Sequence, residues 1–190
     1  MQGSRRPPRV ALRFSSLQNI LPRTTDKCRV DGITQPKKGK KKDVILRLTG
    51  YRFLEHMTDA EIECYGKTLE EAFENAARAL EDTMVDVNSI EPAVREEIVV
   101  EGEDRESLLY SWLEALINKQ DIDGMLYSDI HCKISTEKPG GRFTLKAAIS
   151  GEKFDPEKHE QKTAVKSPTY HAMQISDTAE GVTMRFLLDL

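Results

Sequence analysis

The sequence predicts an α+β fold in which two helices pack on a largely antiparallel sheet. Two segments in the middle of the chain repeat apolar residues with the period of a helix, and segments that alternate apolar and polar residues precede, separate and follow them. The last extended segments are joined by short turns, which suits antiparallel neighbours. Helices and strands combined in this way are typical of the α+β class.

Composition restricts the kind of protein. A chain of 190 residues has the length of one domain, and 38% hydrophobic with 32% charged residues is typical of a soluble cytosolic protein. It contains no run of 18 apolar residues, so we expect no membrane partner. Cys28, Cys64 and Cys132 are odd in number and far apart, which predicts neither a disulfide framework nor a zinc site. We therefore expect a cytoplasmic, reducing location.

Charge divides the chain into two parts. Residues 1–42 contain 12 Lys and Arg against two Asp, a formal charge of +10. Residues 43–190 contain 16 Lys and Arg against 30 Asp and Glu, a formal charge of −14. The first part is rich in proline, glycine and lysine and lacks apolar periodicity, which is typical of disorder. The sequence thus predicts a basic, disordered N-terminal extension at 1–45 and a folded, acidic domain at 46–190.

The extension allows three interpretations. It could be an unstructured tail or the result of a misassigned start codon, an arm whose lysines neutralise RNA phosphates, or an arginine-rich transit peptide. A secretory signal is excluded because no apolar segment follows the first arginines.

A strand–helix unit opens the acidic domain. Residues 51–64 are expected to form two short extended segments with a break at 56–59, and residues 60–64 alternate apolar and charged side chains as a half-buried strand does. Thr68 and Glu71 form a capping-box pattern, which predicts the start of a helix. The apolar stripe of this helix comprises Leu69, Phe73, Ala76, Leu80 and Met84.

A second strand–helix unit follows. Residues 97–101 are expected to form a strand that Gly102 closes. Asp104 can cap the next helix, and Gly124 permits the left-handed turn that ends it. The apolar stripe of this helix comprises Leu109, Trp112, Leu113 and Leu116.

The two units match at an offset of 36 residues. The matched pairs are Ile62 with Ile98, Gly66 with Gly102, Glu70 with Glu106, Phe73 with Leu109, and Leu80 with Leu116. An internal β–α repeat, with both helices on one face of a sheet, would explain the match.

The remainder of the domain is predicted to be β. Turns are expected at Pro139–Gly141 and at Glu180–Gly181. The strands beside these turns are expected at 126–135, 142–150, 172–176 and 182–188.

The sequence lacks the usual catalytic motifs. It has no phosphate-binding glycine loop, no Cys-x-x-Cys pair and no nucleophile elbow. Its histidines show no close metal-ligand spacing; they are His56, His131, His159 and His171. These observations argue against an enzyme.

The end of the chain is the best candidate for a binding site. Asp189 places a side-chain carboxylate beside the α-carboxylate of Leu190, and the alternating strand before them should hold both in place. Two adjacent carboxylates repel each other, and a hard cation such as Ca²⁺ or Mg²⁺ relieves that repulsion. Asp59, in the break after the first extended segment, is the best candidate for a third ligand. The alternative is that Asp59 only starts a turn and that Asp189 is solvated.

The start of the acidic domain resembles the archease family. Residues 51–60, YRFLEHMTDA, are similar to the family signature, an aromatic segment that leads to His-Thr-Ala-Asp. Met57 and Thr58 depart from that signature, but the spacing between His56 and Asp59 is kept.

Later segments carry the same resemblance, in order, as far as the last residue. Residues 66–74 and 107–114 are similar to the family's two helix entries. Residues 165–173 resemble its Val-Lys-Ala-(Ile/Val)-Thr-Tyr segment, with Ser-Pro in place of the small–aliphatic pair, and the final Asp-Leu matches its Asp–aliphatic terminus. The basic extension lies outside the resemblance.

The resemblance implies an accessory protein. Archeases act as turnover factors for the tRNA-splicing RNA ligase, which joins RNA 3′-phosphate or cyclic-phosphate ends to 5′-hydroxyl ends. They promote guanylylation of the ligase's active-site histidine and can broaden the nucleotide that it accepts. Some are described as modulators of a tRNA cytosine methyltransferase.

The resemblance also implies site residues. The family's metal ligands match Asp59, Asp189 and the terminal Leu190, and a lysine implicated in activating the ligase matches Lys166. We expect calcium as the divalent metal ion, with magnesium or manganese as alternatives. The expected partners are the ligase and, as a second candidate, the tRNA methyltransferase.

Two other functions are compatible with the sequence. One is an independent metal-dependent hydrolase that uses Asp59 and Asp189, with His56 or His171 as its base. The other is a chaperone or RNA-binding adaptor for tRNA-modifying enzymes. The charge of the acidic domain argues against direct RNA binding except through the basic arm.

Overall fold

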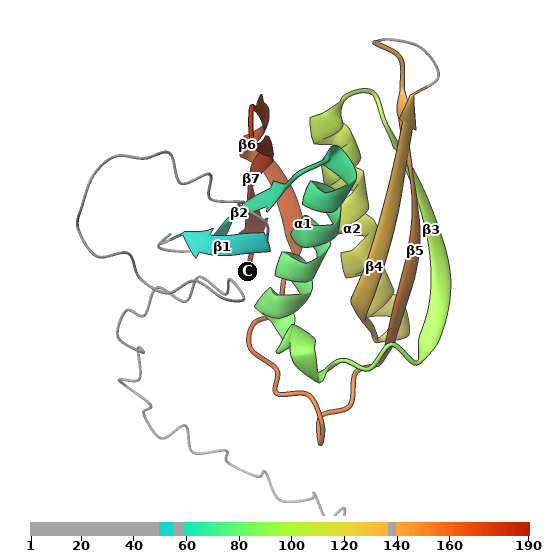
Figure 1. The fold of residues 1–190 in the computed structure, drawn as a ribbon. Helices are drawn as coiled ribbons and strands as arrows, with labels where there is room; N and C mark the ends of the chain where they lie inside the picture. Colours follow the sequence, from blue (N-terminus) through green and yellow to red (C-terminus); the bar gives the residue numbers. More distant parts are fainter. Residues whose placement is uncertain (1–49, 55–58, 137–139) are drawn as a thin grey trace, which may run out of the picture.

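The computed structural model of the protein describes residues 50–54, 59–136 and 140–190 (Figure 1). The predicted extension at 1–45 lies outside these residues, as do His56 and the start of the predicted turn at 139–141. Described in chain order, the elements are β1 (Gly50–Leu54), β2 (Ala60–Gly66), α1 (Leu69–Met84), the 3₁₀ helix η1 (Val87–Ser89), β3 (Val94–Gly102), α2 (Arg105–Asp123), β4 (Met125–Thr136), β5 (Phe143–Lys153), β6 (Ser167–Thr178) and β7 (Gly181–Asp189).

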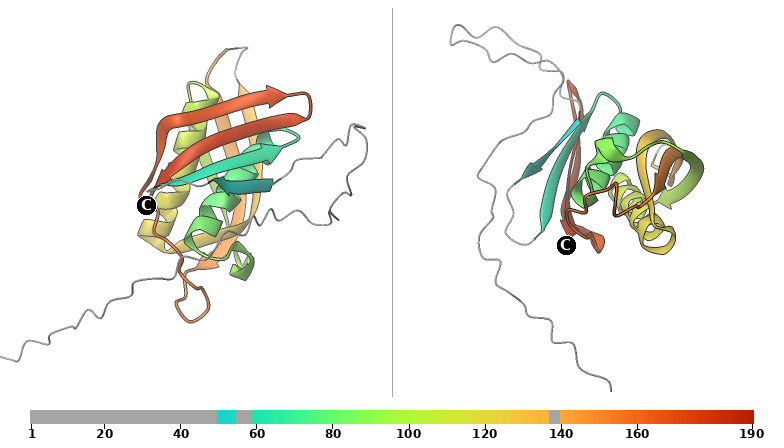
Figure 2. Two further views of the ribbon diagram at one scale, coloured as in Figure 1. Left: turned by 90° about the vertical axis from the view of Figure 1, so that its left-hand side faces the viewer. Right: turned by 90° about the horizontal axis from the view of Figure 1, so that it is seen from below.

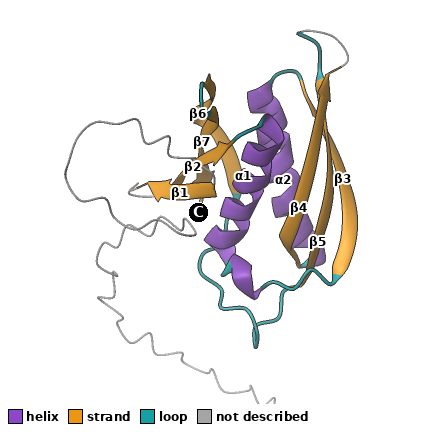
Figure 3. Cartoon of the chain, viewed as in Figure 1, coloured by secondary structure: helices purple, strands orange, loops and turns teal. Residues whose placement is uncertain are grey.

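The two helices lie between two antiparallel sheets. Sheet A has the strand order β1-β2-β7-β6, and sheet B has the order β3-β5-β4. Figure 2 shows the helices as a middle layer, and Figure 3 shows strands on both sides of them. The predicted α+β class, with two helices and antiparallel strands, is confirmed. The division of the strands between two sheets was not predicted.

The burial of the helices explains the second sheet. Both helices contact both sheets: α1 lies against β2 and β4, and α2 lies against β3 and β6. The predicted stripe of α2 is buried and is widened by Leu108 and Ile117. In α1 the small Ala72, Ala77 and Ala79 are fully buried as well. Because alanine is common on both buried and exposed faces of helices, the sequence did not indicate that sheets pack against α1 on two sides.

The predicted helix ends are confirmed with one refinement. Thr68 Oγ1 accepts a hydrogen bond from the backbone N–H of Glu71 at 3.2 Å, while the Glu71 carboxylate accepts from the backbone of Lys67 at 2.7 Å, one residue before the cap. At α2, Asp104 and Ser107 form a reciprocal capping box. Gly124 ends α2 in the left-handed conformation, with φ of 68°.

The two strand–helix units share one steric constraint. A Cβ on Gly66 would lie 2.3 Å from the backbone nitrogen of Ala72, and a Cβ on Gly102 would lie 2.3 Å from that of Leu108. Both glycines therefore let the helix start pack directly on the strand that precedes it. The predicted 36-residue repeat is thus visible in the equivalent close contact between strand end and helix start in the two units. Its two strands lie in different sheets, however, so the repeat is not built on a single sheet, although both helices contact the inner face of each sheet.

A hydrogen bond links the two helices within the core. The indole Nε1 of Trp112 donates to the carbonyl of Phe73 at 3.2 Å, and both side chains are fully buried. Cys64 and Cys132 are also buried and are free thiols. No helix in the described part of the chain is both long and apolar enough to cross a membrane.

One carboxyl group lies within this core. Glu81, on α1, is fully buried, and within the described residues neither its carboxyl oxygens nor the buried hydroxyl of Tyr127 on β4 make a hydrogen bond of good geometry. Burial raises the pKa of Glu81 to about 8, and the nearby backbone of Tyr127 opposes the rise. Glu81 is therefore a neutral acid at pH 7.

We predict that Glu81 makes the fold less stable as the pH rises. The unfolded chain loses this proton near pH 4.5, while the folded chain keeps it until about pH 8. The contribution of Glu81 to the free energy of unfolding is therefore fully present below pH 4.5 and is lost as the pH rises to 8. Between these values the free energy of unfolding should fall by up to about 1.4 kcal/mol per pH unit. Urea unfolding of Glu81→Gln across this range should show a flatter profile and a gain in stability at pH 8.

The exposed Glu114 on α2 supplies the control. Glu114→Gln should follow the native pH profile, because it leaves the buried Glu81 carboxyl in place. Equal slopes for Glu81→Gln and the native chain would contradict the prediction.

Candidate functional site

Three separate chain segments meet at one end of sheet A. In the β2–β7 pairing Ala60 lies opposite Leu188, so Asp59 enters the sheet beside Asp189. In the β6–β7 pairing Ser167 lies opposite Asp189, which brings Lys166 to the same end. Because β7 runs antiparallel to both neighbours, its last residues meet the first residues of both. The chain terminus lies at this end of the sheet (Figure 2).

A hollow of about 500 Å³ lies at this end. Asp59 and Asp189 both line it, so the structure brings the two predicted side-chain ligands together. The other lining residues come from α2, β6 and β7; they are Tyr110, Ser167, Pro168, Thr169, Tyr170, His171 and Leu187.

Lys166 holds the chain terminus. Its backbone N–H donates to the carbonyl of Asp189 at 2.8 Å, and its ammonium group donates to a terminal oxygen of Leu190 at 2.5 Å. The sequence predicted Lys166 as a partner contact. The structure adds that this side chain offsets the charge of the terminal carboxylate.

The donor set suits a hard cation in its chemistry. Asp59, Asp189 and the terminal carboxylate supply only oxygen atoms, which Ca²⁺ and Mg²⁺ prefer. Within residues 50–54, 59–136 and 140–190, however, no three His, Cys, Asp or Glu side chains are placed to hold a metal ion. The terminal carboxylate would therefore have to complete the ligand set, and the metal site stays a prediction.

The wall of the hollow contains a bulge that the sequence did not predict. Between Thr169 and Gln174 the β6–β7 register shifts, and Ala172 takes a positive φ of 56°. Strand β6 begins at Ser167, five residues before the predicted start at 172. The early start includes a proline, which an edge strand tolerates because one side of its backbone needs no partner.

The bulge presents a stacked aromatic pair. The rings of Tyr110 on α2 and Tyr170 on β6 are parallel within 2° with centroids 4.5 Å apart. Tyr170 is 55% exposed. Partial burial and then the neighbouring Tyr110 raise the pKa of Tyr170, so its hydroxyl stays neutral. No pattern in the sequence indicated this pair, because the two tyrosines lie 60 residues apart on different elements.

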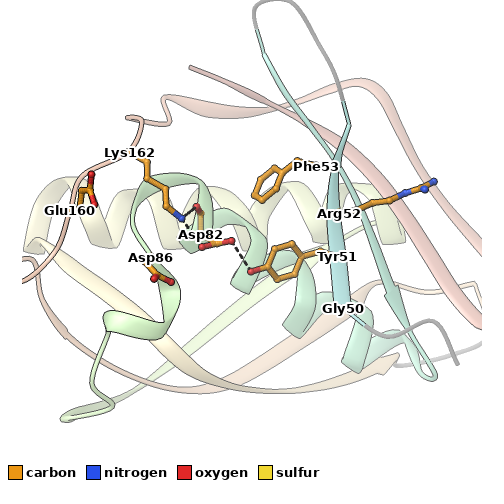
Figure 4. A pocket seen from close by; sticks show the side chains of 8 residues that line it. All are labelled: Gly50, Tyr51, Arg52, Phe53, Asp82, Asp86, Glu160 and Lys162. Atoms are coloured by element: carbon orange, nitrogen blue, oxygen red, sulfur yellow. Dashed lines mark hydrogen bonds and ion pairs between the residues drawn. The ribbon is translucent and has the colours of Figure 1, made fainter. Parts of the chain in front are cut away.

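A second hollow, of about 390 Å³, lies beside β1 and is shown in Figure 4. At its centre the Asp82 carboxylate accepts from the Tyr51 hydroxyl at 3.1 Å and from the Lys162 ammonium at 2.7 Å. The same ammonium donates to the Asp82 carbonyl at 2.8 Å. These bonds join the edge strand, the last turn of α1 and the segment before β6, so this cluster holds elements together.

Comparison with known proteins agrees with the resemblance in sequence. Residues 51–190 match the model of the archease protein family.

The chain belongs to the archease family.

Curated archeases are similar over most of their length. The archease of Pyrococcus furiosus is 50% identical over 134 residues, which cover 70% of this chain and 93% of that protein. The archease of Sulfurisphaera tokodaii is 40% identical over 140 residues, covering 74% and 98%. The solution structure of protein 1598 of Methanobacterium thermoautotrophicum is 34% identical, with a TM-score of 0.62, and covers 74% of this chain and 99% of that chain.

We predict that Lys166 contributes little to the stability of this archease fold. The contact between its ammonium group and the terminal carboxylate is exposed, and such a pair is worth less than about 1 kcal/mol. In Lys166→Met the backbone bond to Asp189 remains, so urea unfolding should show a loss of this size or smaller.

The fully buried Leu188, next to the same strand end, is the comparison. Leu188→Ala should lose about 2–5 kcal/mol through the cavity that it leaves. A similar loss for Lys166→Met would mean that the lysine is a main support of β7 and not a side chain available to a partner.

Proposed function

We propose that this protein is an accessory factor that activates a tRNA-splicing RNA ligase, the enzyme that joins RNA 3′-phosphate or cyclic-phosphate ends to 5′-hydroxyl ends. In this role it promotes guanylylation of the ligase and allows multiple turnover. The observation that carries the proposal is the meeting of Asp59, Lys166 and Asp189 with the terminal carboxylate at one end of sheet A. Family membership supports the accessory role.

The chemistry of the hollow favours binding over catalysis. Its lining includes two carboxylates, hydroxyl groups and the stacked tyrosines. Neither described cysteine lies there, since Cys64 and Cys132 are buried elsewhere in the core. An exposed acidic end, in a part of the chain (residues 43–190) with a formal charge of −14, suits a basic surface on a partner protein.

We further propose that Asp59, Asp189 and the α-carboxylate of Leu190 bind Ca²⁺, with Mg²⁺ or Mn²⁺ as alternatives. A divalent cation at this point offsets negative charge on phosphates of the ligase reaction. Lys166 keeps the terminal carboxylate in place through its two contacts with residues 189 and 190. The half-buried Leu190 packs against the core, which restricts the position of the terminus.

His171 favours a second candidate function. It lines the hollow together with Asp59 and Asp189, so an imidazole base and two carboxylates share one site. That combination could serve a metal-dependent hydrolase. Phosphoester hydrolysis that depends on added metal, and that His171→Ala abolishes, would favour this candidate over the accessory role.

We predict that the protein raises the number of ligations per ligase molecule. The native chain is mixed with a tRNA-splicing ligase, GTP, Mn²⁺ or Mg²⁺, and excess RNA bearing a 2′,3′-cyclic phosphate. Product should exceed one ligation per ligase, and radiolabelled GTP should show faster guanylylation of the ligase. Asp189→Asn should lose the stimulation, because it removes a charge at the end that meets the partner.

Asp177→Asn is the matched control. Asp177 is an exposed aspartate near the far end of β6 and pairs with Arg105 at 2.7 Å. This variant should stimulate as the native chain does. If the native chain gives no gain in turnover, the ligase role is wrong. Protection of a tRNA methyltransferase from aggregation, without any effect on the ligase, would favour the modulator role instead.

We predict that Ca²⁺ binding depends on both aspartates and on a free chain terminus. Asp59→Asn and Asp189→Asn each remove one charged ligand, so calorimetric affinity for Ca²⁺ should fall on the order of tenfold or more. A C-terminal tag turns the α-carboxylate into an amide and should weaken binding too. Thermal melts should change little, since both aspartates lie at strand ends.

Lys166→Met gives a change in the opposite direction. It removes a positive charge beside the terminal carboxylate, so the affinity for Ca²⁺ should rise. Equal Ca²⁺ affinity for the native chain, both aspartate variants and the tagged chain would show that the acidic end is only solvated.

A further inference from the structure

The outer face of sheet B carries an unusual distribution of charge. Side chains that alternate with the buried ones point away from the helices and form rows across β3, β5 and β4. From one end the rows are Arg95–Ser150–Asp129, Glu97–Ala148–His131, Val99–Lys146–Lys133 and Glu101–Thr144–Ser135.

Three cations on this face have no acidic partner among the residues that the structure describes. Lys133 and Lys146 lie directly opposite each other, a placement that is destabilising for like charges. Neither lysine, nor Arg95, forms an ion pair with any residue in the described part of the chain. By contrast Arg142, near the same face, is paired with Glu101 and Glu103.

The cations surround a shallow hollow. A depression of about 410 Å³ lies over Ala148, because this small side chain stands between longer neighbours. Its rim includes Arg95, Lys133 and Lys146, and Val99, 57% exposed, adds an apolar surface. Arg95 and the lysine row are four residues apart along the strand, about 13 Å. The face thus offers two separate points of positive charge on either side of a partly apolar floor.

We propose that this face binds the phosphate backbone of RNA. The proposal rests on the proposed function, because the ligase brings an RNA substrate to the complex. Lysines act as point charges for phosphates, and a polyanion would relieve the repulsion between Lys133 and Lys146. The apolar floor suits a ribose or base better than the carboxylates of an acidic peptide. The same face carries the carboxylates of Glu97, Glu101 and Asp129, so contact with RNA rests on the cations around the hollow and not on a net positive charge.

The face is independent of the carboxylate end. Sheet B lies across the helix layer from sheet A, as Figures 1 and 2 show. The acidic end of sheet A and the cations on the outer face of sheet B can therefore engage two different partners at once: a basic protein surface and a nucleic acid.

Salt-dependent binding tests the proposal on the full chain. Fluorescence anisotropy with a labelled single-stranded RNA is measured over a range of KCl concentrations. Two phosphate contacts are lost in Lys133→Ala/Lys146→Ala, so the slope of log affinity against log salt should fall by about 1.4. Glu97→Gln, which removes a carboxylate from the face, should strengthen binding. Differences between variants isolate the face, because the basic extension is present in every one.

A matched double variant is the control. Lys67 and Lys153 are exposed and lie off the outer face, so Lys67→Ala/Lys153→Ala should bind as the native chain does. Acetylation of lysines, read by mass spectrometry, should show that RNA protects Lys133 and Lys146. Equal slopes for the two double variants, or equal protection by polyglutamate, would overturn the proposal.

The binding assay contains no ligase, so the two proposals fail separately. If RNA does not contact Lys133 and Lys146 in the native chain, and the native chain still stimulates the ligase, only the RNA face is refuted. Normal RNA contact without ligase stimulation would refute only the ligase role.

Discussion

The fold depends on a helix layer that is apolar on two opposite sides. A helix that buries only one stripe needs one sheet, whereas α2 buries a broad surface from Leu108 to Ile117 and α1 buries nearly every position that faces a strand. The bond from the Trp112 indole to the Phe73 carbonyl fixes one helix against the other. With the helices joined in this way, each sheet can dock on a preformed surface. Gly66 and Gly102 make that docking possible, because at both positions the helix start lies so close to the strand that a side chain would not fit between them.

The carboxylate end follows from the central position of β7 in sheet A. A strand with partners on both sides transmits its position to two neighbours, and here it places the residues before β2 and β6 around its own last residues. The site is thus built from three distant parts of the sequence by backbone pairing. The side chain of Lys166 adds a hydrogen bond to the terminal oxygen of Leu190. An arrangement of this design tolerates change in its side chains more easily than change in the register of β7.

The sequence predicted what depends on local patterns. The cap at Thr68, the cap at Asp104 and the left-handed turn at Gly124 each follow from the chemistry of a few adjacent residues, and all three are present. Asp59 and Asp189 were matched through the resemblance to a family, and their proximity follows from strand pairing that no local pattern encodes. The second sheet was not predicted because alanine occurs on buried and exposed helix faces alike, so the buried alanines of α1 do not indicate burial. The bulge in β6 was not predicted because the alternation of apolar and polar residues is already weak around Tyr170 and Ala172, and a shift of register there leaves no visible break in it.

The bulge has a consequence for how molecules of this protein meet one another. Strand β6 is an edge of sheet A, and a regular edge offers its unpaired N–H and C=O groups to any extended chain. The shift between Thr169 and Gln174 distorts that row of groups, and Pro168 removes one of its donors. Sheet A is thereby protected from growing through this edge into an edge-to-edge aggregate, so the strand that borders the carboxylate end stays available for a specific partner.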